Sequence, residues 1–167
     1  MNEAVAAPVD AGVTFELFFE QERRRLWKVM YLLTGDGHEA DEISQEAMVR
    51  VLERWDRVRA MASPAGYLYR VAFNLHRRSR RRRRLIARES PHEGSLDPAA
   101  TVAARVDVMR ALAGLSMEQR QALVLVDFMD MSSEEAGRLL AIDPSSVRSR
   151  LQRARGVLRE RLEEPDD

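Results

Sequence analysis

Hydrophobic residues recur every three or four positions along most of this chain, and no stretch alternates with the period of two that is typical of a strand. The first apolar stripe lies within residues 14–34 and is followed by Gly35, a residue that commonly ends helices. The second follows a capping signal formed by Asp36 and Glu39. The pattern predicts two amphipathic helices. Their buried stripes contain Phe15, Phe18, Phe19, Leu26, Met30 and Leu33, then Ala40, Ile43, Ala47, Val51 and Trp55.

The outward side of the second helix is acidic, with amide and apolar members. At 100° per residue, six side chains fall on one arc opposite the buried stripe. A solvated helix face is the commoner explanation for such a cluster, and a docking face for a basic partner helix is the alternative. The arc contains Glu42, Gln45, Glu46, Val49, Arg50 and Glu53.

A third helix is predicted after an irregular connection at residues 56–62. Ser63 and Pro64 supply an N-cap and a proline at the first helical position. The helix then runs into a stretch of arginines over residues 77–84. Such a run is often only a basic tail, but here it continues a patterned helix whose surface is expected to carry aromatic, amide and arginine side chains. That mixture favours the binding of a nucleic-acid strand over a basic tail without a pattern. The expected surface residues are Tyr67, Tyr69, Arg70, Phe73 and Asn74.

A second helical domain follows a segment rich in serine, proline and glycine. We expect residues 88–102 to be a linker, residues 1–13 a mobile tail and residues 163–167 an acidic tail. One helix is predicted over residues 101–113, and a capping box of Ser116 and Gln119 begins another. The fold class is therefore all-α, with two small helical domains over residues 14–87 and 103–162.

The end of the second domain has the pattern of a helix-turn-helix. Ser132 and Glu135 form a capping box for a helix that ends near Leu140, and Asp143 followed by Pro144 begins the next helix. Ala141 lies in the turn, where many such motifs carry glycine, so a left-handed backbone there is expected to be strained. Val147, Leu151, Ala154 and Leu158 form the buried stripe of the last helix.

The other side of that last helix contains no carboxylate. Arginine, serine and glutamine bond to phosphate oxygens and to base edges in the major groove. The pattern favours DNA reading over an ordinary bundle helix. The outward residues are Ser145, Ser146, Arg148, Ser149, Gln152, Arg153 and Arg155.

Charge and composition narrow the function classes. The net charge is zero, but residues 62–90 hold nine basic residues against one acidic, and residues 132–161 hold seven against four. Two basic zones between acidic ones indicate two polyanion contacts and one partner of another kind. Cysteine is absent and the three histidines lie far apart, so we expect no metal site, no cofactor and no small-molecule substrate. The sequence contains no nucleophile–base pair of the kind that would indicate an enzyme. No signal peptide or membrane span is evident, so a cytoplasmic protein is expected.

The order of these motifs resembles the extracytoplasmic-function sigma factors of bacterial RNA polymerase, which have only the second and fourth sigma domains. The resemblance covers nearly the whole chain and depends on motifs in both domains. These motifs are Tyr31–Asp36, Glu39–Arg50, Tyr67–Asn74, Leu115–Leu123 and Val147–Arg155.

The resemblance implies a non-catalytic subunit that binds core polymerase at the clamp coiled coil of its largest subunit and at the flap, recognises promoter DNA and directs initiation. An anti-sigma factor is an expected further partner. The polymerase contact would contain Asp41, Glu42, Gln45, Glu46, Val49 and Arg50. The minus-ten element would be held by a base pocket of Arg59, Ala60, Met61 and Ala62, and by Arg70, Asn74, Arg77, Arg78 and Arg81. In the minus-thirty-five element, bases would face Arg148, Ser149, Gln152 and Arg153, and phosphates would lie nearer Ser145, Ser146, Arg150 and Arg155.

Two other functions are compatible with the residues. A free-standing helix-turn-helix regulator would dimerise through its N-terminal helices, but the sequence offers no self-complementary apolar face beyond the core stripes. An RNA-binding or adaptor protein would use the arginine run for binding and the second helix to recruit a partner.

Overall fold

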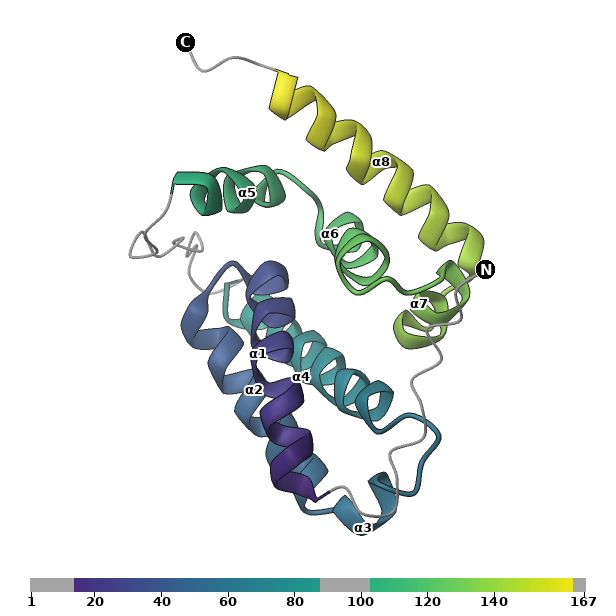
Figure 1. Ribbon diagram of the computed structural model, residues 1–167. Coiled ribbons are helices and arrows are strands. Elements are labelled where there is room, and N and C mark those ends of the chain that lie inside the picture. The colour runs from purple at the N-terminus through teal and green to yellow at the C-terminus, as the bar shows by residue number, and fades with distance from the viewer. Residues whose placement is uncertain (1–13, 88–102, 164–167) are drawn as a thin grey trace. The chain divides into compact units, whose positions relative to one another are not determined.

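The computed structural model describes residues 14–87 and 103–163 (Figure 1). Every regular element in these ranges is a helix, which confirms the predicted all-α fold class. The chain divides into two compact units, which are described separately. The predicted N-terminal tail and linker, and most of the acidic tail, lie outside the described residues. None of the described helices is both long and apolar enough to cross a membrane.

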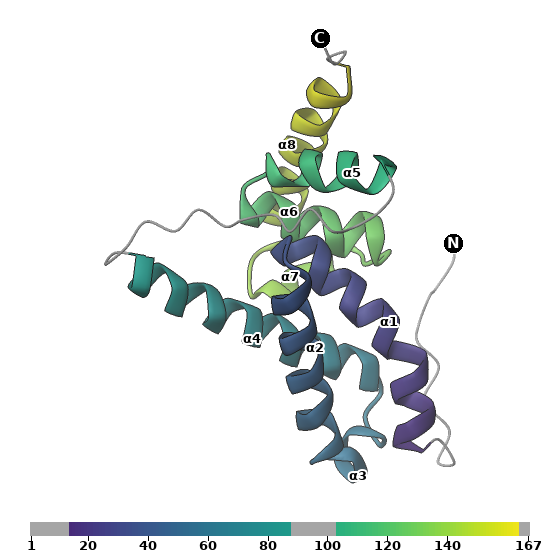
Figure 2. The same cartoon turned by 90° about the vertical axis from the view of Figure 1, so that its left-hand side faces the viewer.

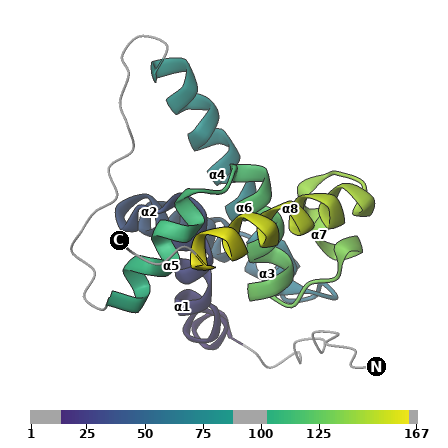
Figure 3. The same ribbon diagram turned by 90° about the horizontal axis from the view of Figure 1, so that it is seen from above.

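The first unit contains most of α1 (Phe15–Thr34), together with α2 (Gly37–Leu52), α3 (Trp55–Val58) and α4 (Pro64–Ala87). Residues 31–36, at the end of α1, group with the second unit. Gly35 has a φ of 71°, a left-handed conformation that glycine adopts without strain, and α1 ends there. The Ser63 hydroxyl accepts a hydrogen bond of 3.0 Å from the backbone of Gly66 and so caps α4 as expected. Figures 2 and 3 show the arginine-rich end of α4 extending away from α1 and α2.

The core of the first unit follows the predicted stripes, with four corrections. Phe19, expected in the buried stripe of the first helix, is exposed. Trp55 is half-buried and belongs to α3, so the connection predicted as irregular contains a short helix. Tyr69 and Phe73, expected on the surface of α4, are buried because this part of α4 packs within the bundle. The Tyr69 hydroxyl donates a 3.2 Å hydrogen bond to Glu22, and burial raises the pKa of Tyr69.

The second unit contains α5 (Ala103–Ala113), α6 (Met117–Leu123), the π-helix η1 (Val124–Phe128), α7 (Ser133–Leu140) and α8 (Pro144–Glu163). Ser116 and Gln119 make both hydrogen bonds of the predicted capping box, at 3.2 and 2.9 Å. The π-helix was not predicted. Its wider turn is marked by a bond from the Met129 N–H to the Val124 carbonyl, five residues back.

The helix-turn-helix is built as the sequence indicates. Ser132 and Glu135 form a reciprocal capping box at the start of α7, and the backbone N–H of Ser145 donates to Asp143 at 2.8 Å at the start of α8. Ala141 has φ 57° and ψ 47°, the left-handed conformation expected of the turn. A Cβ at Gly137 would lie 2.8 Å from the Ile142 carbonyl oxygen, so the close approach of the turn to α7 requires glycine there. Buried residues on α8 are Val147, Leu151 and Ala154, while Leu158 is half-buried.

Candidate nucleic-acid and protein interfaces

The outer face of α2 carries the residues predicted to bind a protein partner. All six predicted residues are exposed except Arg50, which is half-buried, and Val49 keeps 49% of its surface accessible. Contacts one helical turn apart hold the polar side chains in place. Gln45 donates to Asp41 at 2.7 Å, and Arg50 donates to Glu46 at 2.7 Å. The face is therefore an ordered acidic and amide surface around one exposed apolar side chain.

A groove of about 580 Å³ runs between this face and the second half of α4. One wall is acidic and belongs to α2, and the other is basic and belongs to α4, with apolar side chains on both. We call it the α2–α4 groove. It is lined by Glu39, Glu42, Ile43, Gln45, Glu46, Val49, Leu75, Arg78, Ser79 and Arg82.

The groove joins two predicted sets that sequence reasoning kept apart. Arg78 was assigned to DNA, yet it lies in the same groove as Glu42 and Glu46. An occupant of the groove would meet a cation on one side and carboxylates on the other. The structure therefore associates Arg78 with the face predicted to bind a protein.

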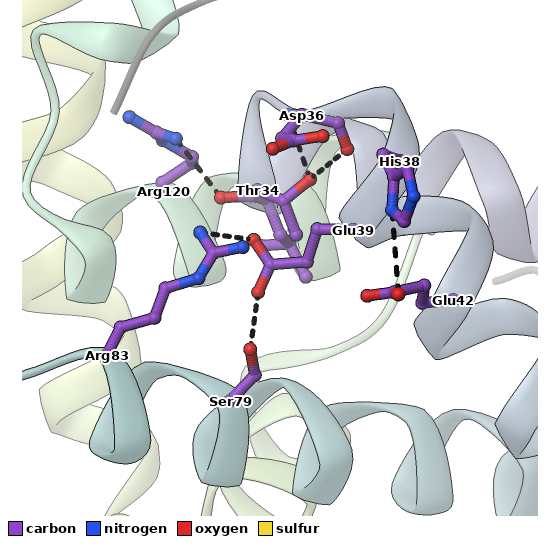
Figure 4. Close-up of polar contacts among 9 residues, drawn as sticks. Thr34, Asp36, His38, Glu39, Glu42, Ser79, Arg83 and Arg120 are labelled. Carbon is purple, nitrogen blue, oxygen red and sulfur yellow. Dashed lines mark hydrogen bonds and ion pairs between the residues drawn. The ribbon is translucent and has the colours of Figure 1, made fainter. Parts of the chain in front are cut away.

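Glu39 lies within this groove and connects its two walls. Its side chain is almost fully buried, and its carboxylate accepts a 2.8 Å hydrogen bond from Ser79 and pairs with Arg83 at 2.9 Å (Figure 4). The capping signal of Asp36 and Glu39 predicted the start of α2 at the right position, but the Glu39 carboxylate binds α4, and the Asp36 N–H donates to the Thr34 hydroxyl. Sequence reasoning missed the role of Glu39 because its partners on α4 lie about forty residues away.

The candidate base pocket is the segment between α3 and α4. Arg59, Ala60 and Ala62 are exposed, and Met61 is half-buried. Arg59 pairs with Asp56 at 3.0 Å, and the Met61 N–H donates to the Val58 carbonyl at 3.0 Å. The segment is thus ordered while its side chains stay accessible.

The predicted α4 residues fall along one exposed side of the helix. Arg70, Asn74, Arg77, Arg78 and Arg81 are all exposed, at steps of four, three, one and three. Arg54 comes from the turn after α2 and donates to the Tyr67 hydroxyl at 3.1 Å, which connects that turn to the first part of α4.

The predicted reading face of α8 is largely accessible. Ser145, Arg148, Ser149, Gln152, Arg153 and Arg155 are exposed, while Ser146 and Arg150 are half-buried.

Two of its arginines are paired with carboxylates that lie outside α8. Arg148 pairs with Glu134 of α7 at 3.4 Å. Arg155 makes two bonds with Asp127 of η1, at 3.1 and 2.5 Å. The prediction of a face without carboxylates holds for α8 alone, because neighbouring helices bring in two.

Two protein-family models match the chain. Sigma-70 region 2 matches residues 18–86, and Sigma-70, region 4 matches residues 105–158. The first match contains the α2–α4 groove and the candidate base pocket, and the second contains the helix-turn-helix.

Two curated relatives match most of the chain. The ECF RNA polymerase sigma factor SigE of Mycolicibacterium smegmatis is 32% identical over 152 residues, which cover 85% of this chain and 59% of the relative. The RNA polymerase sigma-E factor of Streptomyces avermitilis is 32% identical over 155 residues, which cover 91% of this chain and 87% of the relative. The chain thus spans less than two thirds of the first relative and most of the second.

Solved structures share the fold. The sigma factor RpoE from Bartonella quintana, in complex with the anti-sigma factor NepR, superposes with a TM-score of 0.77 at 21% identity, covering 91% of this chain and 98% of that one. CnrH, in complex with the cytosolic domain of CnrY, gives a TM-score of 0.63 at 21% identity, covering 89% of this chain and 86% of that one.

Proposed function

Because this chain belongs to the extracytoplasmic-function group of RNA polymerase sigma factors, which act in transcription initiation, we propose that it binds core polymerase through its first unit and promoter DNA through both units. It works in the cytoplasm as a specificity subunit and performs no catalysis of its own. An anti-sigma factor that covers these surfaces is the proposed means of control.

The observation that carries the polymerase contact is the α2–α4 groove. Glu42 and Glu46 form its acidic wall, and exposed Val49 adds apolar surface beside them. A helix with basic side chains on one flank and apolar side chains at its centre complements these residues. The clamp coiled coil of the largest polymerase subunit is the proposed occupant, and the flap is the proposed contact of the second unit.

Charge reversal on the groove tests this contact. Glu42→Arg together with Glu46→Arg should weaken the affinity for core polymerase and leave far-UV circular dichroism unchanged, since both side chains are exposed. Glu16→Arg together with Glu20→Arg is the matched control, because these exposed glutamates lie on α1 of the same unit and do not line the groove. Unchanged affinity of the groove variant would remove α2 as the docking face.

The DNA contacts are divided between the units. The proposed site for an extruded base of the minus-ten element is the segment of Arg59, Ala60, Met61 and Ala62. Extrusion of a base costs a few kcal/mol, and stacking and charge in this segment would offset that cost. The exposed side of α4 would hold the adjoining strand. The exposed face of α8 would read the minus-thirty-five element in the major groove.

Pull-down with core polymerase followed by run-off transcription on genomic fragments tests the whole proposal. The expected result is a stable complex that initiates at defined start sites. Sequence-specific DNA binding without any polymerase contact would instead support the free-standing regulator. RNA binding through α4 without initiation would support the adaptor.

A further inference from the structure

We propose that Asp127 is a specificity-determining residue, which holds Arg155 away from the DNA backbone until α8 meets a matched sequence. The inference depends on the proposed role of α8 in reading promoter DNA. It concerns a residue of η1 that lies outside the reading helix and that sequence patterns did not single out.

The pairing has a two-bond geometry. The Nε of Arg155 donates to one carboxylate oxygen of Asp127 at 3.1 Å, and a terminal nitrogen of Arg155 donates to the other at 2.5 Å. Arg155 is 55% exposed, so the pair lies at the surface where DNA can approach. The same edge of the guanidinium would be used for two-bond contact with a phosphate. A phosphate that approaches this edge must displace Asp127, whereas one that binds the remaining N–H donors lies close to the carboxylate.

The π-helix places the carboxylate at this position. Val124 and Leu125 are buried, whereas Asp127 and Phe128 are exposed, so η1 anchors one side in the core and presents Asp127 on the other. The hydrogen bonds between Asp127 and Arg155 join residues that are 28 positions apart in the sequence. The site of the acid is thus fixed by the core and not by a flexible loop.

Neutralisation of Arg155 changes what nonspecific DNA gains from binding. A free arginine at a phosphate releases counterions whatever the sequence, whereas an arginine already paired with a carboxylate does not. The carboxylate also repels a phosphate that comes near it. Only a complex held in register by base contacts would keep a phosphate beside Arg155 long enough for it to replace Asp127. The difference in affinity between matched and unmatched DNA is therefore larger than the base contacts alone would provide.

The neighbouring arginines differ from Arg155. Arg148 makes a single contact with Glu134 at 3.4 Å, and both side chains are more than half exposed, so this pair restrains little. Arg153 has no carboxylate partner within the described part of the chain. The proposed effect belongs to the Asp127–Arg155 pair, and Glu134→Gln is its matched control.

The test uses holoenzyme reconstituted from core polymerase and the full chain. Binding is measured over a range of salt to a promoter fragment selected from random DNA, and to the same fragment with its upstream element scrambled. Asp127→Asn should bind the scrambled fragment more tightly, with a log–log salt slope steeper by about 0.9, the value for one added phosphate contact. Binding to the selected fragment should change less, so the ratio of affinities should fall. Glu134→Gln should leave the slope on the scrambled fragment nearly unchanged.

Two further variants separate this role from a structural one. Arg155→Lys keeps the charge but loses the planar fork, so its slope should lie between those of wild type and Asp127→Asn, because the Asp127 carboxylate is still present. Asp127→Asn combined with Arg155→Gln should match Arg155→Gln alone, because the effect of Asp127 passes through Arg155.

Three results would overturn the inference: an unchanged slope in Asp127→Asn, an equal gain on both fragments, or a persisting effect of Asp127→Asn without Arg155. Wild-type holoenzyme that does not discriminate between the fragments would instead overturn the proposed role of α8, and the inference with it.

Discussion

The two units hold their functional helices in different ways. In the first unit, α4 is fixed by side chains that come from distant parts of the chain, as Glu39 with Ser79 and Tyr69 with Glu22 show. In the second, α6, α7 and α8 each begin at a local cap, at Ser116, Ser132 and Asp143 respectively. Because these caps are local, the start of each helix in the helix-turn-helix can be predicted from a few neighbouring residues. Distant contacts make the α2–α4 groove depend on the assembly of the whole unit.

The largest expected effect is the loss of the distant anchor in the first unit. Glu39→Ala removes the acceptor of the Ser79 hydrogen bond, which should lower the free energy of unfolding by about 2 kcal/mol, the typical value for a hydrogen bond to a charged group. The ion pair with Arg83 should add little, because Arg83 is more than half exposed. Urea unfolding followed by tryptophan fluorescence reports on this unit, since Trp27 and Trp55 are the only tryptophans in the chain.

Glu39→Gln is the control for this prediction. It keeps an oxygen acceptor for Ser79 in a side chain of similar shape, so it should cost less than Glu39→Ala. Equal losses from the two variants would mean that the negative charge, and not the hydrogen bond to α4, provides the stability.

The difference between local caps and distant contacts also determines which features the sequence predicts correctly. Caps such as Ser63, Ser116 and Ser132 were predicted because their partners lie three residues away. At Asp36 the local pattern predicted the start of α2 but not the partners of Glu39, which lie on α4. Tertiary packing likewise buries Tyr69 and Phe73, whose periodicity alone left them on the surface.

The predicted site residues are mostly exposed, as a site requires, but their grouping came only from the fold. Arg78 lies in the α2–α4 groove because α4 packs beside α2. Asp127 meets Arg155 because of a π-helical turn, for which the sequence has no reliable signal. The specific base and polymerase contacts stay predictions.

A cap variant in the second unit should have a smaller and more local effect. Ser132→Ala removes the acceptor for the Glu135 N–H and should cost about 1 kcal/mol. Hydrogen exchange of the amides of α7 should accelerate, while the tryptophan fluorescence transition of the first unit stays in place. Ser133→Ala is the control, because that residue is not the cap. A shift of both units together would contradict the local character of this cap.

Relief of turn strain should stabilise the second unit by a similar or smaller amount. Ala141 adopts φ 57°, which costs about 1–2 kcal/mol for a residue with a Cβ, whereas glycine costs about 0.5–1 kcal/mol in chain entropy. Ala141→Gly should therefore raise the free energy of unfolding of the second unit by roughly 0.5–1 kcal/mol, as measured by hydrogen exchange. Asp130→Gly, at φ 56°, should gain less, because aspartate tolerates this conformation better than alanine. A loss of stability in Ala141→Gly would mean that the turn is not strained.

The smallest expected effect is a pH dependence at the caps of the second unit. Hydrogen bonds from the backbone and hydroxyl of Ser132 lower the pKa of Glu135, and hydrogen bonds from Ser145 lower the pKa of Asp143. A carboxyl whose pKa is lower in the folded state stabilises that state fully above its ordinary value, here 4.5 for Glu135 and 3.8 for Asp143. The contribution disappears as the pH falls through the lowered values.

The amides of α7 and the first turn of α8 should therefore lose protection on acidification below about pH 4.5. Glu135→Gln with Asp143→Asn keeps an acceptor at each cap but does not titrate, so this variant should flatten the dependence. If wild type and variant lose stability in parallel, then the acid sensitivity of the second unit comes from ion pairs such as Asp127–Arg155, and its long-range contacts matter as much as those of the first.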